Sequence, residues 1–497
     1  MAPIEIRIDS RVRLRVAGLG EELAAELRDV FTHNNPQYHR IKSMGFYTKE
    51  KPFIKTWVDE VDSSGDAWVS VPRGGMGAVR ELLRDSELKW KVLDLRTQGS
   101  ASLAGKIPQH RIALWDHQRG AKVAAIAKEN CLLRAPTGSG KTTAAIAIAS
   151  ALQLPTIVIV WSGTLFKQWA QRLVAELGIA PEDVGVVRGK VTKLRPVTIA
   201  MQQTLNKRSD KQWRELNDAF GVVICDEVQR FAAKTFMSTI DRFSARYRIG
   251  ISADHTRKDR KEFLTYDMFG DVAHEVKRET LINKGIVHDV VVRVVPTEFE
   301  ASWYVEQRVN PQETPDFNRL LDEMVGDDER NGLAAEQVIV DEARGETVIA
   351  MSHRREHCEE LRRAVVPTCG DVGLMLGGKE SEAELERSKA ALTSGDMKCA
   401  VGTIQAIGTG TDIPAATRGV IVTPLANNKQ LWGQVRGRFC RTTEGKSGAE
   451  LIYLWDREVF GWSHLENLCK WNSQVFVWHN SWWVEAVQYM KEERHGR

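Results

Sequence analysis

The chain has 497 residues, of which 42% are hydrophobic and 27% charged, with a formal net charge of +3 at pH 7. This length exceeds one ordinary core, so we expect about three domains with the composition of a soluble globular protein. No apolar run approaches the length of a membrane span, and the first residues lack the pattern of a secretory signal, which predicts a cytoplasmic protein. The seven cysteines include no CxxC pair, which argues against a zinc site or a disulfide framework.

The first hundred residues predict a small α+β domain that begins with a pair of alternating strands. Apolar residues of one parity are Ile4, Ile6, Ile8, Val12, Leu14 and Val16, and the other parity holds Arg7, Arg11, Arg13 and Arg15. The arginine face is either solvated or a contact for a DNA backbone. Helices are expected over residues 21–30 and 76–83, and residues 98–102 are a plausible linker. Residues 1–105 are therefore expected to form an accessory domain, with DNA binding as one candidate role.

Residues 135–143, with the sequence Ala-Pro-Thr-Gly-Ser-Gly-Lys-Thr-Thr, predict a phosphate-binding loop. A short apolar segment precedes the loop and an alanine-rich segment follows it, which is the strand, loop and helix order that this motif requires. Glycines without a Cβ let backbone N–H groups point at a polyphosphate, the lysine reaches the β and γ phosphates, and the threonine hydroxyl meets Mg²⁺. The expected ATP-binding residues are Pro136, Thr137, Gly138, Ser139, Gly140, Lys141 and Thr142.

Other segments of the same region indicate a parallel sheet around this loop. The amide of Gln118 is suited to the edge of an adenine. Two β-branched runs, 155–160 and 197–201, end in polar residues that suit contacts with nucleic-acid phosphates. These polar residues are Ser162, Thr164, Gln202 and Thr204.

A second buried strand is expected to end in two adjacent acids, Asp226 and Glu227. Asp226 suits the metal shell of a nucleotide held by Lys141 and Thr142, and Glu227 is suited to take the proton of an attacking water. A further strand, 247–251, is followed by small polar residues.

The order and spacing of these segments resemble the core of superfamily 2 helicases, most closely the XPB-like translocases and the UvsW-like phage DNA helicases. Over about residues 110–460, Gln118 matches the glutamine motif, Gly138 to Thr142 motif I, Asp226 to Gln229 motif II, and Ser252-Ala253 motif III. The chain departs from the family at Gln229, where His or Asp is common, and at Asp254, where Thr is usual. Gln229, Ser252 and Ala253 are thereby implied to couple hydrolysis to movement.

The same resemblance extends into the second half of the chain. It implies that Ser352 and Thr403 contact the nucleic-acid backbone, and that Gly410 and Asp412 approach the nucleotide. Residues 434–441 match the motif Q-x-x-G-R-x-x-R, in which Gln434 is implied to orient near the γ phosphate. Arg438 and Arg441 are three residues apart, so on a helix they share a face and act together as arginine fingers.

Five tryptophans between residues 462 and 483 predict a helical tail that either packs on the core or stacks on bases. The resemblance implies an α/β fold with two tandem RecA-like domains, a small α+β N-terminal domain and this helical tail. The expected boundaries are 1–105, 106–285, 286–460 and 461–497. The implied function is that of an ATP- and Mg²⁺-dependent DNA helicase or translocase, without a membrane partner, acting on single-stranded, forked or branched DNA. The sequence does not give the oligomeric state, and a monomer is favoured. An RNA helicase and an ATP-regulated nucleic-acid-binding protein without unwinding remain the alternatives.

Overall fold

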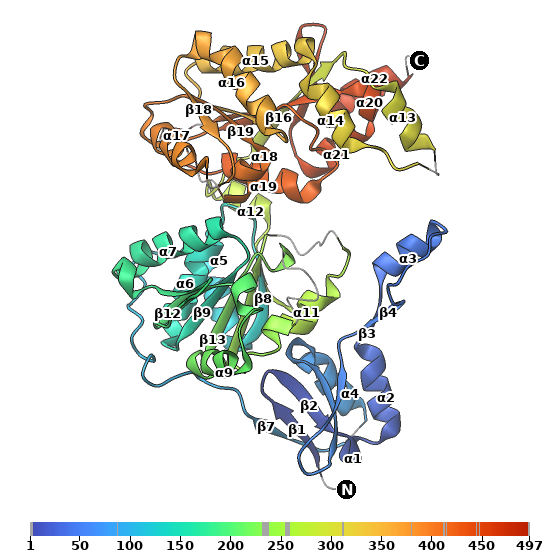
Figure 1. Ribbon diagram of the computed structural model, residues 1–497, viewed down its shortest axis with the longest axis vertical. Helices are drawn as coiled ribbons and strands as arrows, with labels where there is room; N and C mark the ends of the chain where they lie inside the picture. The colour runs from blue at the N-terminus through green and yellow to red at the C-terminus, as the bar shows by residue number, and fades with distance from the viewer. Residues whose placement is uncertain are drawn as a thin grey trace. The chain divides into compact units, whose positions relative to one another are not determined.

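The computed structural model describes residues 3–86, 88–230, 238–253, 259–310, 313–378, 380–410, 413, 415–443, 445–446 and 448–495. The chain forms two compact units (Figure 1). The first contains Met1–Pro136 and Gly140–Lys277, and the second contains Thr137–Ser139 and Arg278–Arg497. All seven cysteines are free, as expected. Among the helices of the described ranges, none is long and apolar enough to cross a membrane.

The N-terminal part of the first unit is a five-stranded sheet with its own apolar core. The strand order is β5 (Val58–Val61), β6 (Ala67–Pro72), β2 (Arg11–Arg15), β1 (Ile4–Ile8), β7 (Trp90–Asp94). The alternating apolar residues of β1 and β2 are buried against α2 (Glu21–Val30) and α4 (Met76–Asp85), as the period-two pattern predicts. The remaining elements of this part are α1 (Val16–Leu19), β3 (Thr32–Asn34), α3 (Pro36–Ser43) and β4 (Phe53–Lys55).

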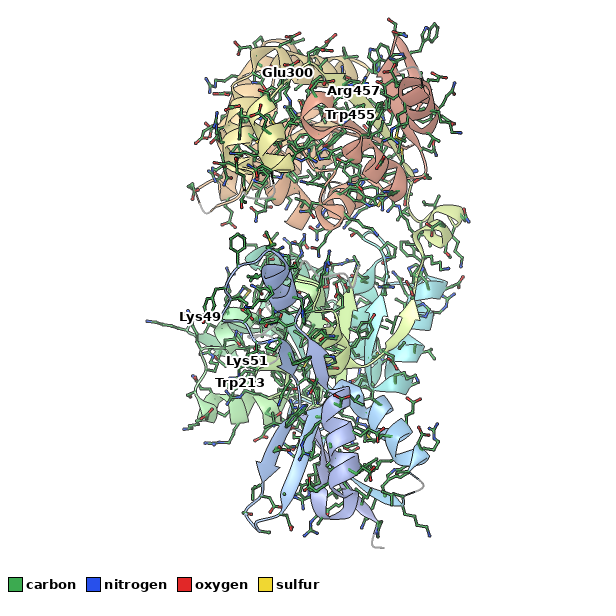
Figure 2. The ribbon with its side chains drawn as sticks, turned by 90° about the vertical axis from the view of Figure 1, so that its right-hand side faces the viewer. Lys49, Lys51, Trp213, Glu300, Trp455 and Arg457 are labelled. Carbon is green, nitrogen blue, oxygen red and sulfur yellow. The ribbon has the colours of Figure 1, made fainter. Side chains whose placement is uncertain are left out.

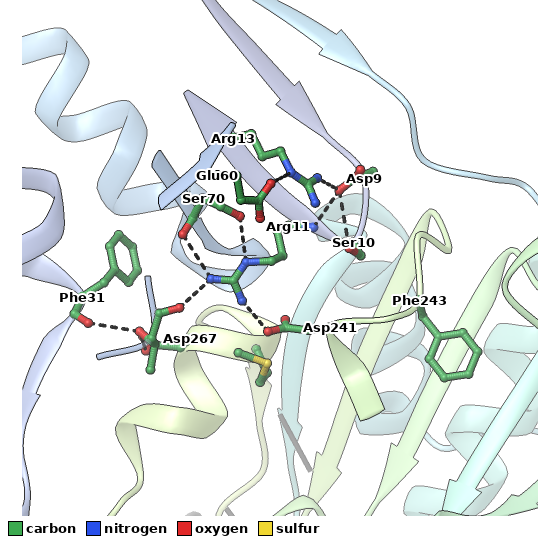
Figure 3. Close-up of polar contacts among 12 residues, drawn as sticks. Asp9, Ser10, Arg11, Arg13, Phe31, Glu60, Ser70, Asp241, Phe243 and Asp267 are labelled. Atoms are coloured by element: carbon green, nitrogen blue, oxygen red, sulfur yellow. Dashed lines mark hydrogen bonds and ion pairs between the residues drawn. The ribbon is translucent and has the colours of Figure 1, made fainter. Parts of the chain in front are cut away.

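The arginine face of β1 and β2 is partly solvated, because Arg11 is buried whereas the side chains of Arg7, Arg13 and Arg15 are 33%, 23% and 40% exposed. Its contact with a DNA backbone stays a prediction. Each arginine is paired with a carboxylate of the same unit. The pairs are Arg7 with Glu5 and Asp62, Arg11 with Asp241, Arg13 with Asp9 and Glu60, and Arg15 with Asp66. Figure 3 shows the buried Arg11 guanidinium between the Ser70 hydroxyl, which it reaches at 2.9 Å, and Asp241.

Buried arginines also attach the N-terminal domain to the sheet that follows it. Arg73, 2% exposed, donates to the Asn130 amide oxygen at 3.0 Å, and Arg248, 0% exposed, donates to the backbone carbonyl of Ser10 at 2.9 Å. The expected linker is itself packed, because the Thr97 N–H donates to the Ser244 carbonyl at 2.8 Å and Gly99 pairs with Phe220. The N-terminal domain therefore has a separate core but belongs to the first unit.

The rest of the first unit is an eight-stranded sheet that is parallel except at the β10–β11 edge. Its order is β11 (Val191–Lys193), β10 (Gly185–Arg188), β12 (Val197–Met201), β9 (Thr156–Val160), β13 (Val222–Asp226), β14 (Tyr247–Ser252), β8 (Asn130–Arg134), β15 (Val272–Glu275). The helices are α5 (Asp116–Lys128), α6 (Lys141–Leu152), α7 (Gly163–Leu177), α8 (Gln202–Leu205), α9 (Asp210–Ala219) and α11 (Phe263–Phe269). The β-branched runs form fully buried central strands, as expected for a sheet covered on both faces.

The second unit contains another eight-stranded sheet, parallel except at its β22–β23 edge. Its order is β18 (Val372–Met375), β19 (Cys399–Thr403), β17 (Val348–Ser352), β20 (Arg418–Ile421), β21 (Ala449–Asp456), β16 (Val290–Thr297), β22 (Val475–His479), β23 (Trp482–Glu485). The helices are α12 (Arg278–Asn283), α13 (Ser302–Val309), α14 (Phe317–Val325), α15 (Asp328–Ala343), α16 (Arg355–Cys369), α17 (Glu382–Ser394), α18 (Ile404–Gly410), α19 (Lys429–Phe439), α20 (Arg457–Phe460), α21 (Ser463–Trp471) and α22 (Ala486–His495). The two sheets have the tandem RecA-like architecture that the motifs predict.

The tail is only partly helical, which corrects the expectation for residues 461–497. α21 and α22 are helices, but β22 and β23 between them form a hairpin that extends the second sheet. Trp478 and Trp483 contact each other across this hairpin, with ring centroids 5.0 Å apart. The aromatic spacing thus arises from cross-strand pairing as well as from helix packing.

Candidate nucleotide-binding site

The phosphate-binding loop has the backbone conformation that the glycines predict. The loop follows β8 and ends at Gly140, the N-cap of α6, so that Lys141 is the first helical residue. Gly138 and Gly140 have φ angles of 90° and 76°, in the left-handed region that glycine occupies without strain. A Cβ on Gly140 would lie 2.2 Å from the amide nitrogen of Gln118, so no side chain fits there. Loop and helix start thus form a cradle of the kind that binds phosphate.

Gln118 and Lys141 both lie against this loop. Gln118 is 4% exposed; its amide oxygen accepts from the Trp115 N–H at 2.9 Å, and its amide nitrogen donates to the Gly140 carbonyl at 3.4 Å. The Lys141 ammonium donates to the Pro136 carbonyl at 3.3 Å, which holds the cation at the loop. Gln118 therefore fixes the start of α5 and the loop in addition to the adenine contact expected of it.

The acid pair stands at the end of β13. Asp226 is 5% exposed, and its carboxylate accepts a hydrogen bond from the Trp169 indole at 2.8 Å. Burial and the neighbouring Glu227 raise the pKa of Asp226 to about 6, against the opposing effects of the Trp169 bond and the Lys141 charge. Such a buried carboxylate beside a second one is stabilised as an anion by a bound cation. Trp169 was not expected here, because nothing in the pattern of α7 distinguishes a hydrogen-bonding tryptophan from a core residue.

A chain of hydrogen bonds connects the acid pair to the end of the next strand. The Gln229 amide nitrogen donates to the Glu227 carboxylate, and the Ser252 hydroxyl donates to the Gln229 amide oxygen at 2.6 Å. Glu227 has a φ of 53°, an uncommon conformation for a residue with a side chain. Gln229 thus connects the acid pair after β13 to Ser252 at the end of β14. Ala253 follows Ser252 directly, whereas Asp254 lies outside the described residues.

These groups fit ATP with Mg²⁺. The loop follows β8 and Asp226 ends β13, and β8, β14 and β13 are parallel neighbours, so both groups lie at the same edge of the sheet. The Thr142 hydroxyl and the Asp226 carboxylate are the hard oxygen donors that Mg²⁺ prefers beside phosphates. The glycine cradle supplies the backbone N–H groups for the phosphates themselves.

The expected residues of the second unit gather around α18 and α19. Thr403 precedes α18 and accepts from the Ala406 N–H at 3.3 Å. Arg438 on α19 donates to the Gly408 carbonyl of α18 at 3.1 Å, and Gln434 lies one turn earlier on α19. Gly410 ends α18, and Asp412 lies outside the described residues.

One expectation about this group is wrong. α19 ends at Phe439, so Arg441 lies beyond the helix and does not share a helical face with Arg438. Arg441 instead pairs with Val287 in an antiparallel bridge. The helix period therefore does not place the two arginines together.

The polar residues proposed for nucleic-acid contact have local structural roles. Ser162 caps α7 by accepting from the Leu165 N–H at 3.2 Å, and Thr204 accepts from the Gly189 N–H at 2.9 Å. Ser352 is 0% exposed, with its hydroxyl bonded to His357 at 2.9 Å. Gln202 is 5% exposed, whereas Thr164 is exposed on the first turn of α7.

Comparison with known proteins shows what this chain is similar to. Residues 111–257 match the family described as type III restriction enzyme, res subunit. The probable helicase D10 of Escherichia phage T5 is 25% identical over 379 residues, covering 76% of this chain and 77% of that protein. The DNA 3'-5' helicase XPB of Mycobacterium tuberculosis is 29% identical over 248 residues, covering 48% of this chain but only 44% of that relative.

The solved structures support the fold. A fragment named as an HsdR subunit of a type I restriction enzyme from Vibrio vulnificus YJ016 aligns with a TM-score of 0.54 and 18% identity, covering 90% of this chain and 83% of that chain. Together, the matches show that residues 111–257 are similar to the type III restriction enzyme res-subunit family, and that the chain is similar to proteins named as helicases.

Proposed function

We propose that this protein is an ATP-dependent DNA helicase or translocase. The observation that carries the proposal is that the glycine cradle with Lys141 lies at the same sheet edge as two adjacent acids, Asp226 bonded by Trp169 and Glu227 bonded by Gln229. A phosphate loop alone would fit many nucleotide-binding proteins, whereas an acid pair connected through Gln229 to Ser252 fits one that hydrolyses ATP and transmits the result. The relatives named as DNA helicases favour DNA as the track.

The residues of the site divide the reaction among them. The loop N–H groups and Lys141 hold the phosphates, and Thr142 and Asp226 hold Mg²⁺, which neutralises phosphate charge when bound. Glu227 accepts the proton of the attacking water. The hydrogen bond from the Gln229 amide holds the Glu227 carboxylate in position. Gln434, Arg438 and Arg441 are proposed to stabilise the charge of the γ phosphate, with Gly410 and Asp412 near the nucleotide.

Movement would follow from a change in the grip of the two units on DNA during each ATP cycle. The proposed DNA contacts come from residues at or just beyond the carboxyl ends of four strands, namely Ser162, Thr164, Gln202, Thr204, Ser352 and Thr403. Because the side chains of Ser352 and Gln202 are buried, these two positions would contact phosphates through backbone N–H groups. Thr164 is the member of this set whose side chain is exposed.

The test is ATP hydrolysis by wild type and Glu227→Gln, alone and with single-stranded DNA, forked DNA or duplex RNA. We expect forked DNA to stimulate the wild type, and the substitution to lower the rate at least about a hundredfold while nucleotide binding persists, because it removes a general base without removing the phosphate cradle. The matched control is Glu182→Gln, which should leave the rate unchanged because Glu182 is an exposed acid of the first unit.

The other outcomes identify the alternatives. Stimulation by duplex RNA in place of DNA would indicate an RNA helicase. ATP-dependent binding to DNA without strand displacement or translocation would indicate a regulatory binding protein. Hydrolysis that is indifferent to every nucleic acid would contradict the motor, and an unchanged rate in Glu227→Gln would contradict the role of that residue.

A further inference from the structure

A slender arm, residues 32–55, projects from the N-terminal domain (Figure 1). It consists of the two-stranded sheet of β3 and β4 with α3 between them. No residue of α3 is buried, so packing inside the protein does not explain the side chains that the helix and the following loop carry.

The base of the arm is firmly held. Asn35, 1% exposed, caps α3 by accepting from the Gln37 N–H at 3.2 Å and donates to the Lys51 carbonyl at 2.8 Å, which closes the hairpin. On the helicase domain, the Asp267 carboxylate lies 2.9 Å from the His33 imidazole and accepts from the Thr56 hydroxyl at 2.7 Å. The arm is thus a fixed extension of the first unit, and its outer part is presented to solvent in a defined place.

The charge of the arm is strongly positive. Its five cations are Arg40, Lys42, Lys49, Lys51 and Lys55, against the single carboxylate of Glu50. These residues give 24 positions a formal net charge of +4, whereas the whole chain carries +3. All five cations are exposed; Figure 2 labels Lys49 and Lys51. In the described part of the chain none of the five is ion-paired, although Lys55 lies over the Trp57 ring, 4.7 Å from its centroid.

This charge differs in kind from that of the β1–β2 arginines. Those arginines are each matched by a carboxylate, so they contribute little to the field outside the protein. The cations of the arm have no such partners among the described residues, and they therefore attract a polyanion from solution.

Large apolar side chains accompany the cations. Phe46, Tyr47 and Phe53 are 58%, 82% and 51% exposed, and Met44 is 56% exposed. Water-exposed aromatic rings interleaved with lysines are the combination that proteins use to bind single strands, since the rings stack on bases and the cations contact phosphates. In intact duplex DNA the base faces are already stacked on each other, so such rings find their partners on unpaired bases.

We propose that the arm binds unpaired bases of the DNA substrate, with Phe46 and Tyr47 stacked on them and Lys49 and Lys51 on the adjoining phosphates. The choice of DNA rests on the proposed function. Because the arm is fixed to the unit that carries Lys141 and the Asp226–Glu227 pair, its binding would keep the opened strand next to these residues.

The test is equilibrium binding of the full chain, without ATP, to forked DNA with 2-aminopurine at the first unpaired position. Wild type should quench the fluorescence by stacking, and Phe46→Ala/Tyr47→Ala should abolish the quenching and weaken binding about tenfold or more, since each stacked base contributes about 1–3 kcal/mol. The control is Trp90→Ala, an exposed ring of the same domain that lies outside the arm.

The lysines have a separate readout, because their binding to phosphates depends on salt. Lys49→Ser/Lys51→Ser should lower the slope of log binding constant against log salt by about 1.4 for a single strand, at about 0.7 for each phosphate that a lysine no longer neutralises. Lys89→Ser/Lys91→Ser removes the same charge from the same domain and should leave the slope unchanged.

The possible results separate the inference about the arm from the proposed function. If the arm variants bind and quench like wild type while DNA still stimulates hydrolysis, the arm does not bind unpaired bases but the proposed motor stands. An equal loss of affinity for blunt duplex DNA would overturn the assignment to unpaired bases. Quenching that depends on the arm in a protein whose hydrolysis ignores DNA would support the arm and contradict the motor, so the two failures are distinguishable.

Discussion

Ser252 holds Gln229 in position beside Glu227. Its hydroxyl is fully buried, so water does not replace the bond to the Gln229 amide when the hydroxyl is removed. We expect Ser252→Ala to lower kcat of DNA-stimulated ATP hydrolysis about tenfold, the effect of losing one hydrogen bond of about 1–1.5 kcal/mol, with the KM for ATP nearly unchanged. Steady-state kinetics at saturating forked DNA measures both constants.

The control for this prediction is Ser150→Ala. Ser150 is also buried and hydrogen-bonded, but to the Pro108 carbonyl at 2.8 Å, away from the acid pair. It should lower stability without a selective loss of kcat. Equal kinetic effects of both substitutions would show that the Ser252 bond has no special role in the reaction.

Gly140 is required for two reasons that can be separated. Its φ of 76° strains any other residue, and its Cβ would meet Gln118 at 2.2 Å. Gly189 has a φ of 58°, but a Cβ there meets no atom within 4 Å. We expect both Gly→Ala variants to lose about 1 kcal/mol of stability from the left-handed backbone, and only Gly140→Ala to lose nucleotide binding. Titration with a fluorescent ATP analogue and thermal unfolding give the two readouts, and binding retained by Gly140→Ala would refute the close-packed cradle.

At the scale of elements, a buried ion pair joins α15 to the central strands of the second sheet. The Arg330 guanidinium donates to the Asp456 carboxylate at 2.7 Å, both side chains are 1% exposed, and Thr297 donates to the same carboxylate at 2.6 Å. Arg330→Leu leaves Asp456 buried without its cation, so the free energy of unfolding of this unit should fall by about 3–5 kcal/mol.

The comparison for Arg330 is an exposed pair in the same unit. Arg319 bonds Glu323 at 3.0 Å with side chains 57% and 37% exposed, so Arg319→Leu should cost only a few tenths of a kcal/mol, about the value of a helical surface pair. Urea unfolding followed by circular dichroism measures the difference. Similar costs for the two substitutions would mean that burial of the Arg330 pair adds nothing to its importance.

Single elements were predictable where one physical signal dominates. The β-branched run predicted β9, because a strand buried on both faces is apolar throughout. The alternation of apolar and polar residues predicted β1 and β2, because such strands are buried on one face. The strands β22 and β23 were missed, because tryptophans spaced at nearly helical intervals do not distinguish a helix from a hairpin. Whether a cation has a carboxylate partner depends on where the fold places it. The sequence therefore does not distinguish the β1–β2 arginines, which are paired, from the cations of the arm, which are not paired with any described residue.

At the scale of the whole molecule, motif order predicted the two RecA-like sheets, but not how the N-terminal domain is attached. The sequence gives no sign that Arg73 and Arg248 are buried, yet both donate hydrogen bonds between that domain and the helicase sheet. Such contacts join residues far apart in the chain, and no local pattern specifies them. The adjacent acids Asp226 and Glu227, by contrast, are specified by a single strand and its end.

The attachment predicts that the N-terminal domain and the helicase sheet of the first unit unfold together. A chain of residues 106–497 would leave Asp241 without Arg11, and Asp267 without His33 and Thr56. Removal of one partner of a buried charge typically costs about 3–5 kcal/mol, so this truncated chain should unfold at markedly lower denaturant than the full chain or fail to fold.

A point substitution tests the same attachment without truncation. Arg11→Met in the full chain should shift the single unfolding transition of the first unit to lower denaturant, because burial raises the pKa of Asp241 and the Arg11 charge is what opposes that rise most strongly. Burial penalises the charged form of Asp241, and without the arginine that penalty is less opposed, so the loss of stability should increase as the pH rises and be larger at pH 8 than at pH 5. Two separate unfolding transitions of the first unit in the wild type would mean that the N-terminal domain unfolds independently. A chain of residues 106–497 as stable as the full protein would mean that the buried arginines do not stabilise the helicase sheet.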